Sequence, residues 1–200
     1  TGSDCCCFSF FANKTITTGE GGMAVFKSEE IAKKARKLIN HGLSSQTRYY
    51  HESVGYNFRM TNMQAAIGVA QIEKIEILLK KRKDIFLNYD KILKNEKLLT
   101  LLPKNDWSEN SYWLYTFIIN GIKRVDRDRL LNNMQNKGIE CRPGFYSLNL
   151  MKPFKKYAKD DYMVSNQLSD STLSLPTTSI NSEEQRYIAD TLILEIKKLL

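Results

Sequence analysis

Residues 8–23 read FSFFANKTITTGEGGM, and this stretch decides how the rest of the sequence is interpreted. An apolar run ends at Asn13 and Lys14, hydroxyl and β-branched residues follow, and a Gly-Glu-Gly-Gly segment leads into Met23. Residues 5–11 predict a fully buried strand, and the glycines predict a tight turn or a close backbone approach. The pattern therefore places one lysine directly after a buried strand and directly before a glycine-rich turn.

Lys14 is the candidate nucleophile of this sequence. A primary amine anchored at the end of a strand is suited to forming a Schiff base with an aldehyde cofactor. Ser9 lies earlier on the same strand, and its hydroxyl is a candidate phosphate ligand. The alternative is an ordinary lysine beside a β-turn. The glycine segment lacks the GxxxxGK[ST] spacing of a Walker phosphate loop, so that interpretation is set aside.

The composition is that of an ordinary globular protein. The chain has 200 residues, of which 42% are hydrophobic and 26% charged, enough for one domain with a sizeable core or for parts of two. No apolar run approaches the ~18 residues that a membrane span needs. Neither end reads as a targeting segment, so we expect a cytoplasmic protein without a membrane partner. The chain does not begin with Met, and we expect a fragment whose natural start lies upstream.

Charge and cysteine usage leave two minor alternatives. The net charge of +8 allows a non-catalytic basic module that binds nucleic acid or an acidic partner, but the lysines are spread over predicted helix faces. We therefore expect a solvated basic surface and no nucleic-acid partner. The cysteines form no CxxC pair, so we expect no metal site and interpret them as reduced, buried thiols. They are Cys5, Cys6, Cys7 and Cys141.

In the first half, turn and capping signals outline a hairpin and two helices. MAVF, residues 23–26, predicts a second short strand. Ser28 predicts the start of a helix that runs to about Asn40. A polar, aromatic loop covers residues 43–60. Thr61 and Gln64 predict a capping box that opens a helix reaching to about residue 93, long enough that we expect a bend or a bridge between two domains.

The second half predicts helices packed on a small sheet. The expected strands are 112–119, 139–143 and 172–176, and the expected helices are 126–136 and 162–169. Gly138 is expected to end the first of these helices. Ser182 and Gln185 predict a second capping box, which opens the last helix.

Three segments together resemble the signatures of the DegT/StrS family of sugar-nucleotide aminotransferases, which use pyridoxal phosphate (PLP). They are FSFFANKTITTGEGGM at 8–23, VGYNFRMTNMQAAIGVAQIEKIE at 54–76 and GIECRPGFYSLNLMKPF at 138–154. Their order and the gaps between them also fit. The resemblance implies an α/β chain of PLP-dependent transferase fold type I, like aspartate aminotransferase. Residues 1–75 would end the large PLP-binding domain, and residues 76–200 would form a long bridging helix and the small C-terminal domain.

The resemblance also implies roles for individual residues. Lys14 matches the lysine that binds the cofactor covalently and then moves protons as general base and acid. Ser9 matches a serine that binds the cofactor phosphate. Asn57 matches an asparagine that reaches the cofactor phosphate of the neighbouring subunit, which implies a homodimer with shared active sites; on composition alone it reads as a turn residue. Glu20 is part of the motif, and bracing the glycine turn is an equally good role for it.

Three residues are tentative substrate ligands: Arg59, Arg142 and Tyr146. Arg59 either braces its own loop or meets a phosphate. Arg142 either pairs with a diphosphate or makes a salt bridge at the edge of the core. Tyr146 and Asn149 stand in a stretch where family members commonly carry histidine, and this departure bears on sugar specificity.

The activity that the resemblance implies is an amino transfer. Glutamate would donate the amino group to a nucleotide-linked 4-keto-6-deoxyhexose, with GDP-4-keto-6-deoxymannose as the first candidate and a UDP- or dTDP-linked sugar as the alternative. The 4-amino sugar would serve O-antigen or another surface polysaccharide. Lys14 argues against the relatives that carry histidine there and dehydrate sugars. The family's front half supplies the aspartate and the stacking side chain for the cofactor ring, so we expect these 200 residues alone to bind PLP weakly and to be inactive.

Overall fold

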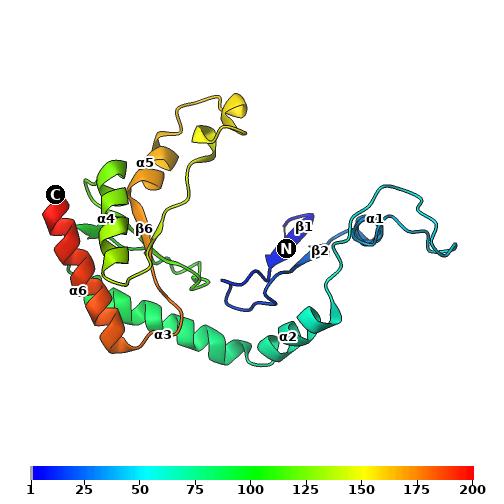
Figure 1. The fold of residues 1–200 in the computed structure, drawn as a ribbon, viewed down its shortest axis with the longest axis horizontal. Coiled ribbons are helices and arrows are strands. Elements are labelled where there is room, and N and C mark those ends of the chain that lie inside the picture. The colour runs from blue at the N-terminus through cyan, green and yellow to red at the C-terminus, as the bar shows by residue number, and fades with distance from the viewer. Residues whose placement is uncertain (1) are drawn as a thin grey trace. The chain divides into compact units, whose positions relative to one another are not determined.

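The computed structural model describes residues 2–200, and the chain divides into two compact units with a boundary after Leu78 (Figure 1). We call residues 2–78 unit 1 and residues 79–200 unit 2. Each is described by itself.

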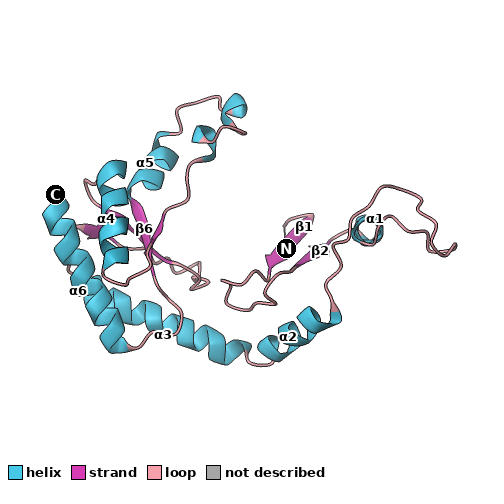
Figure 2. Ribbon diagram, in the orientation of Figure 1, coloured by secondary structure: helices cyan, strands magenta, loops and turns pink. Residues whose placement is uncertain are grey.

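Unit 1 holds a two-stranded antiparallel hairpin followed by two helices (Figure 2). Strand β1, Cys5–Ser9, pairs with β2, Gly22–Phe26, so that Ser9 lies opposite Gly22. Helix α1 spans Glu29–Ile39 and α2 spans Asn62–Ile72. The predicted second strand and the two predicted helix starts are confirmed.

The predicted burial of the first strand is wrong. The strand ends at Ser9 instead of residue 11, and most of its side chains are exposed, Phe8 to 49%. Cys5 and Cys7 are exposed free thiols as well, so they are not the buried thiols that we expected. The physical reason is that the described residues build only two strands here. A fully buried strand needs packed layers on both of its faces.

The helix starts of unit 1 follow their capping residues. The Ser28 hydroxyl accepts a hydrogen bond from the amide of Ile31, three residues into α1. Thr61 and Gln64 form the predicted capping box of α2. The long helix predicted after it is interrupted at Glu73 and Lys74, and α3 then spans Ile75–Leu93. The bend that its length suggested is therefore present as a break between two helices.

Unit 2 contains a four-stranded antiparallel sheet in the order β3-β4-β6-β5. Its strands are β3 Leu99–Thr100, β4 Tyr115–Ile119, β5 Arg142–Pro143 and β6 Thr172–Leu175. Its later helices are α4 Arg124–Asn136, α5 Met163–Ser171 and α6 Ser182–Leu199, with short 3-10 turns at Leu148–Leu150 and Lys155–Tyr157. The strands predicted at 112–119 and 139–143 are shorter than expected, and α4 begins two residues before the predicted Asp126.

The apolar core of unit 2 lies between one face of the sheet and helices α3, α4 and α6. Alternate residues of β4 and β6 point into it, as period-2 patterning requires. Tyr115 is buried to 2% exposure and donates its phenol hydrogen to Asp90 Oδ1 of α3 at 2.9 Å. The other buried apolar residues include Phe86, Tyr89, Leu93, Phe117, Ile119, Leu130, Met134, Leu173, Leu192 and Ile196.

Burial also raises the pKa of the Cys141 thiol to about 12, so this thiol is protonated at neutral pH.

The capping box predicted for the last helix is wrong by one residue. Asn181, not Ser182, is the N-cap: its side chain accepts from the amides of Glu183 and Glu184, and Glu184 accepts from the amide of Asn181. Gln185 is 3% exposed and bonds instead to Asn88 and to the carbonyl of Ile85. Asparagine caps as well as serine does, and the hydrogen bonds of the buried Gln185 select the register.

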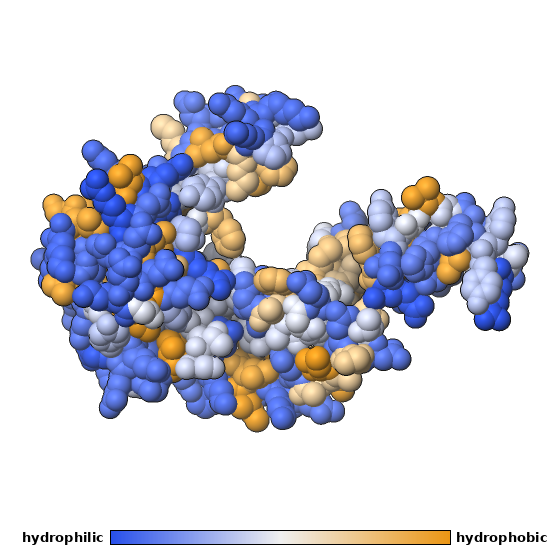
Figure 3. All heavy atoms as spheres, in the orientation of Figure 1, coloured by the Kyte–Doolittle hydropathy of each residue, from blue (hydrophilic) through white to orange (hydrophobic). Residues whose placement is uncertain are grey.

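Many apolar side chains remain on the surface of the described chain (Figure 3). In unit 1 they include Met63 at 80% exposure and Phe58 at 70%.

No helix among residues 2–200 is both long enough and apolar enough to cross a membrane. Within the same residues, no three histidine, cysteine or acidic side chains gather as they would around a metal ion.

The N-cap of α6 can be tested by paired substitutions. We expect Asn181→Ala to lower the free energy of unfolding by about 1 kcal/mol, because two amide hydrogens lose their acceptor. Ser182→Ala should change it by less than about 0.5 kcal/mol, as for other surface positions. Urea unfolding followed by circular dichroism measures both, and a larger loss for Ser182→Ala would contradict the assignment.

Candidate active site

Lys14 lies in the connection between β1 and β2, which we call the lysine connection, residues 10–21. The strand ends five residues before Lys14, so the strand does not anchor this residue as the sequence suggested. A tight turn does: the amide of Lys14 donates to the carbonyl of Phe11 at 2.9 Å. The side chain of Lys14 is half-buried. The amine therefore extends from a short, hydrogen-bonded turn.

The two ends of the lysine connection are tied together by Phe10. Its amide donates to Gly21 O at 2.9 Å, and its carbonyl accepts from the amide of Thr18 at 2.9 Å and from Thr17 Oγ1 at 3.0 Å. Thr18 is 5% exposed and donates its hydroxyl to Glu20 O at 2.6 Å. These bonds close the connection into a compact loop whose outer part carries Lys14.

Ser9 and Lys14 lie at the same end of the hairpin. Ser9 is exposed, and its hydroxyl accepts only a long hydrogen bond, 3.4 Å, from the amide of Phe11. A primary amine can bind an aldehyde, and a hydroxyl can donate a hydrogen bond to a phosphate; PLP carries both of these groups. The residues present thus fit part of a PLP site. The ring-binding groups that the family resemblance implies have no counterpart assigned in this chain.

Asn57 and Arg59 are held by the end of α1. Asn57 is exposed and pairs through its backbone with Asn40, while Arg59 Nη1 donates to Asn40 Oδ1 at 3.2 Å. Arg59 also lines an open groove of about 1060 Å³ between the hairpin and α1. The bracing role considered for Arg59 is therefore present in the structure.

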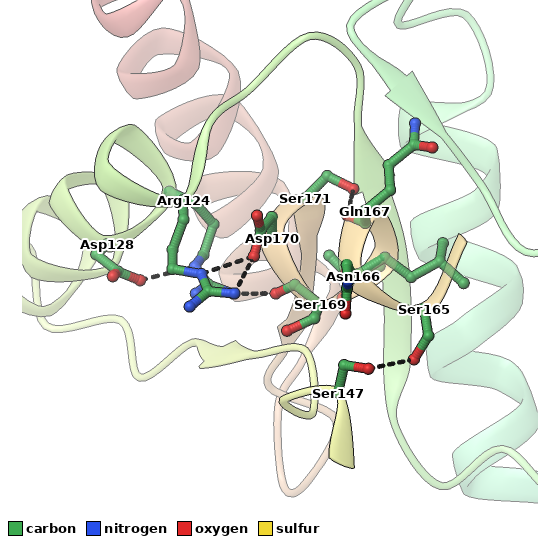
Figure 4. Close-up of polar contacts among 12 residues, drawn as sticks. Arg124, Asp128, Ser147, Ser165, Asn166, Gln167, Ser169, Asp170 and Ser171 are labelled. Atoms are coloured by element: carbon green, nitrogen blue, oxygen red, sulfur yellow. Dashed lines mark hydrogen bonds and ion pairs between the residues drawn. The ribbon is translucent and has the colours of Figure 1, made fainter. Parts of the chain in front are cut away.

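Arg142 and Tyr146 lie in unit 2, at and just after the edge strand β5. Arg142 is exposed and approaches Glu140 at 3.5 Å, so it makes a surface ion pair instead of one at the edge of the core. The ring of Tyr146 lies under the guanidinium of Arg124, 5.4 Å from ring centroid to Cζ. Arg124 in turn pairs with Asp170, with Nε donating at 2.6 Å (Figure 4). Tyr146 is thereby positioned by two helices, α4 and α5.

The segment that follows Arg142 is also fixed by hydroxyl contacts. Ser147 is buried and bonds Ser165 of α5 at 2.7 Å (Figure 4), and it also bonds Asn149. These residues line a hollow of about 430 Å³ together with Tyr157 and Tyr162. Asn149, which stands in the stretch where family members commonly carry histidine, therefore faces a polar and aromatic hollow inside unit 2.

Sequence reasoning missed two residues that support these positions, Gln71 and Arg124. Gln71 accepts a hydrogen bond from the amide of Thr17 at 2.9 Å, across 54 residues of sequence. The available signal was its spacing of seven from Gln64, which puts both side chains on one face of a helix. For Arg124 the only signal was an arginine near a helix start, which does not identify a partner.

Comparison with known proteins decides the family. Residues 1–193 match the model of the DegT/DnrJ/EryC1/StrS aminotransferase family. The chain belongs to this family. GDP-perosamine synthase from Vibrio cholerae is 39% identical over 178 residues, covering 88% of this chain and 48% of that protein. A Helicobacter pylori transaminase named for UDP-4-amino-4,6-dideoxy-N-acetyl-β-L-altrosamine is 32% identical over 134 residues, 66% of this chain and 36% of its own length.

Solved structures of a putative sugar aminotransferase have the same fold. The putative sugar aminotransferase Spr1654 from Streptococcus pneumoniae in its PLP form matches with a TM-score of 0.89 at 28% identity, over 99% of this chain and 53% of that chain. Its PMP form matches with a TM-score of 0.88 at 27% identity, over 99% of this chain and 54% of that chain. The predicted fold type and the family's use of PLP are confirmed. The chain spans about half the length of the curated relatives it matches.

The segment after Arg142 depends on one glycine. A Cβ added at Gly144 would lie 1.7 Å from Thr172 Oγ1, because the backbone runs directly against β6. We expect Gly144→Ala to lower the free energy of unfolding by about 1–3 kcal/mol, as overpacked sites do. Leu148→Ala, on the same segment but 61% exposed, should cost less than about 0.5 kcal/mol. Thermal unfolding compares the two variants, and equal stability would show that the backbone adjusts freely.

Proposed function

We propose that this chain is the lysine-bearing half of a PLP-dependent aminotransferase that acts on a nucleotide-linked 4-keto-6-deoxyhexose. The observation that carries the proposal is the placement of Lys14. It sits on a closed, hydrogen-bonded connection that begins directly after Ser9, within a chain that belongs to a family of aminotransferases. The alternative of a non-catalytic basic module has no such support.

Lys14 would serve both binding and proton transfer. Its amine would hold the aldehyde carbon of the cofactor, and after release it would take a proton from one carbon and return it to another. The hydroxyl of Ser9 would donate a hydrogen bond to the cofactor phosphate. When bound, PLP supplies an electron sink for the carbanion that proton removal creates.

The proposed substrate carries GDP. GDP-perosamine synthases from three bacteria are 32–39% identical to this chain, which favours GDP-4-keto-6-deoxymannose, with glutamate as the amino donor. A transaminase named for a UDP-linked sugar is 32% identical over a shorter stretch, so a UDP-linked sugar is the second candidate. Arg142 would meet the diphosphate, and Tyr146, packed on Arg124, would face the sugar.

The proposed assembly is a homodimer with shared sites. Residues 1–75 would close the large cofactor-binding domain, and residues 76–200 would contribute the long helix and the small domain. Asn57, exposed on the loop after α1, would reach the cofactor phosphate of the neighbouring subunit, and Arg59 would lie beside it. The product, a nucleotide-linked 4-amino sugar, would serve the synthesis of O-antigen or another surface polysaccharide in the cytoplasm.

The role of Lys14 is tested by covalent trapping. The full-length protein is incubated with PLP and reduced with borohydride, and the added mass is located by peptide mass spectrometry. We expect the label on the peptide that contains Lys14, with loss of the label and at least about a hundredfold loss of turnover in Lys14→Ala. Lys27→Ala, an exposed lysine at the end of β2, is the matched control and should keep both. A folded protein without label on Lys14 would overturn the proposal.

The nucleotide is tested by competition between substrates. We expect a higher kcat/KM for the GDP-linked 4-keto sugar than for the UDP-linked one, since each good hydrogen-bonded base contact discriminates by about tenfold or more. The 4-amino product is identified by mass spectrometry. Preference for the UDP-linked sugar would overturn the substrate assignment and leave the aminotransferase assignment intact.

A further inference from the structure

Helix α2 contacts the lysine connection at two backbone atoms. Gln71 Oε1 accepts from the amide of Thr17 at 2.9 Å, and Gln64 Nε2 donates to the carbonyl of Glu20 at 3.2 Å. The two glutamines are two helical turns apart and share one face of α2. Gly68 lies between them, where an added Cβ would be 3.1 Å from Thr18 Cγ2. One face of α2 thus supports the segment that carries Lys14.

This face is the part of α2 that is shielded from solvent in the described chain. Of residues 62–72, only Gln64, Gly68 and Gln71 are half-buried, while the helix's apolar side chains are exposed, Met63 to 80% and Val69 to 57%. The large apolar side chains of α2 therefore do not hold it against the lysine connection. Two directional amide contacts and the close approach of Gly68 to the Thr18 methyl group do. Hydrogen bonds define relative position more sharply than non-directional apolar contact does.

The contacts continue from α2 to the turn of Lys14. Thr17, held by Gln71, donates its hydroxyl to the carbonyl of Phe10 and accepts from the amide of Gly19 at 2.9 Å. Phe10 directly precedes Phe11, whose carbonyl accepts from the amide of Lys14 at 2.9 Å. A shift of Thr17 would be transmitted through Phe10 to this turn.

We propose that Gln64 and Gln71 are positioning residues for Lys14, with opposite hydrogen-bonding requirements. The proposal rests on the proposed function for the role of Lys14. Gln71 is used as an acceptor. Gln64 is used as a donor toward Glu20, because its oxygen already accepts from the amide of Thr61 at 2.9 Å and from the Thr61 hydroxyl at 3.1 Å. The same substitution, glutamine to glutamate, should therefore have different effects at the two positions.

The first test measures the connection without reference to turnover. Hydrogen exchange of residues 10–22 is followed by mass spectrometry in the full-length protein. Gln71→Met removes the acceptor of the Thr17 amide, and we expect about five- to tenfold faster exchange there, as for the loss of one hydrogen bond. Gln71→Glu keeps an acceptor and should exchange at about the wild-type rate. Gln64→Glu keeps the capping box but loses the hydrogen bond to the carbonyl of Glu20. We therefore expect the amides of residues 10–22 to exchange faster in this variant.

The second test measures whether the amine of Lys14 is displaced. PLP is added, and the fraction of Lys14 labelled after borohydride reduction is followed against pH, together with kcat and KM for the keto sugar. We expect Gln71→Met and Gln64→Glu to shift the pH profile of labelling and to lower kcat by about tenfold or more, as misplaced groups do, with KM unchanged. Met63→Gln, on the exposed side of α2, is the control and should match the wild type.

The outcomes separate the two proposals. Wild-type exchange in Gln71→Met and Gln64→Glu would overturn the positioning role, and so would faster exchange with an unchanged pH profile and kcat. Equal effects of Gln71→Met and Gln71→Glu on exchange would also overturn it, because the acceptor would then not matter. Absence of label from Lys14 in the wild type would instead overturn the proposed function.

Discussion

The apolar core of the described chain is confined to unit 2, and this confinement governs how each part is held. Alternate side chains of β4 and β6 meet α3, α4 and α6, so burial of apolar area stabilises that unit. In unit 1, Thr18 is the one side chain among residues 2–78 that is buried, at 5% exposure. Unit 1 is therefore organised by backbone pairing, caps and amide contacts, and its candidate catalytic residue sits where those directional bonds converge.

Capping residues in the sequence correctly predicted the helix starts that depend only on neighbouring residues. Ser28 and the Thr61–Gln64 pair marked helix starts correctly, because a cap is settled within a few residues. The register of the last helix could not be predicted in the same way. Asn181 and Ser182 are both good caps, and the choice depends on Gln185, whose partner Asn88 lies 97 residues away. A contact between residues so far apart produces no periodic pattern in the sequence, so it could not be predicted.

The candidate site shows the same division between local and distant information. The motif around Lys14 could be recognised in the sequence, and it places Ser9 and Lys14 at the same end of the hairpin. The burial of β1 could not be predicted, because an apolar run indicates only that a strand can be covered. The described residues of unit 1 supply two strands, without packed layers on both faces of them. The sequence pointed to Tyr146 but not to Arg124 and Asp170, which position it. The stacking of Arg124 on its ring and the ion pair of Arg124 with Asp170 join segments that the chain brings together only in the folded unit.

Gln64 is a single side chain that serves two elements. Its oxygen closes the first turn of α2, and its nitrogen supports the connection at Glu20. The start of the helix and the end of the loop are consequently one cooperative structure, in which fraying of either frees an amide group needed by the other. Substitutions at Thr61 and in the glycine-rich turn should then be energetically non-additive, although the two sites are far apart in sequence. Two of the three segments that resemble the family's signatures, residues 8–23 and 54–76, are therefore joined in this chain by direct hydrogen bonds.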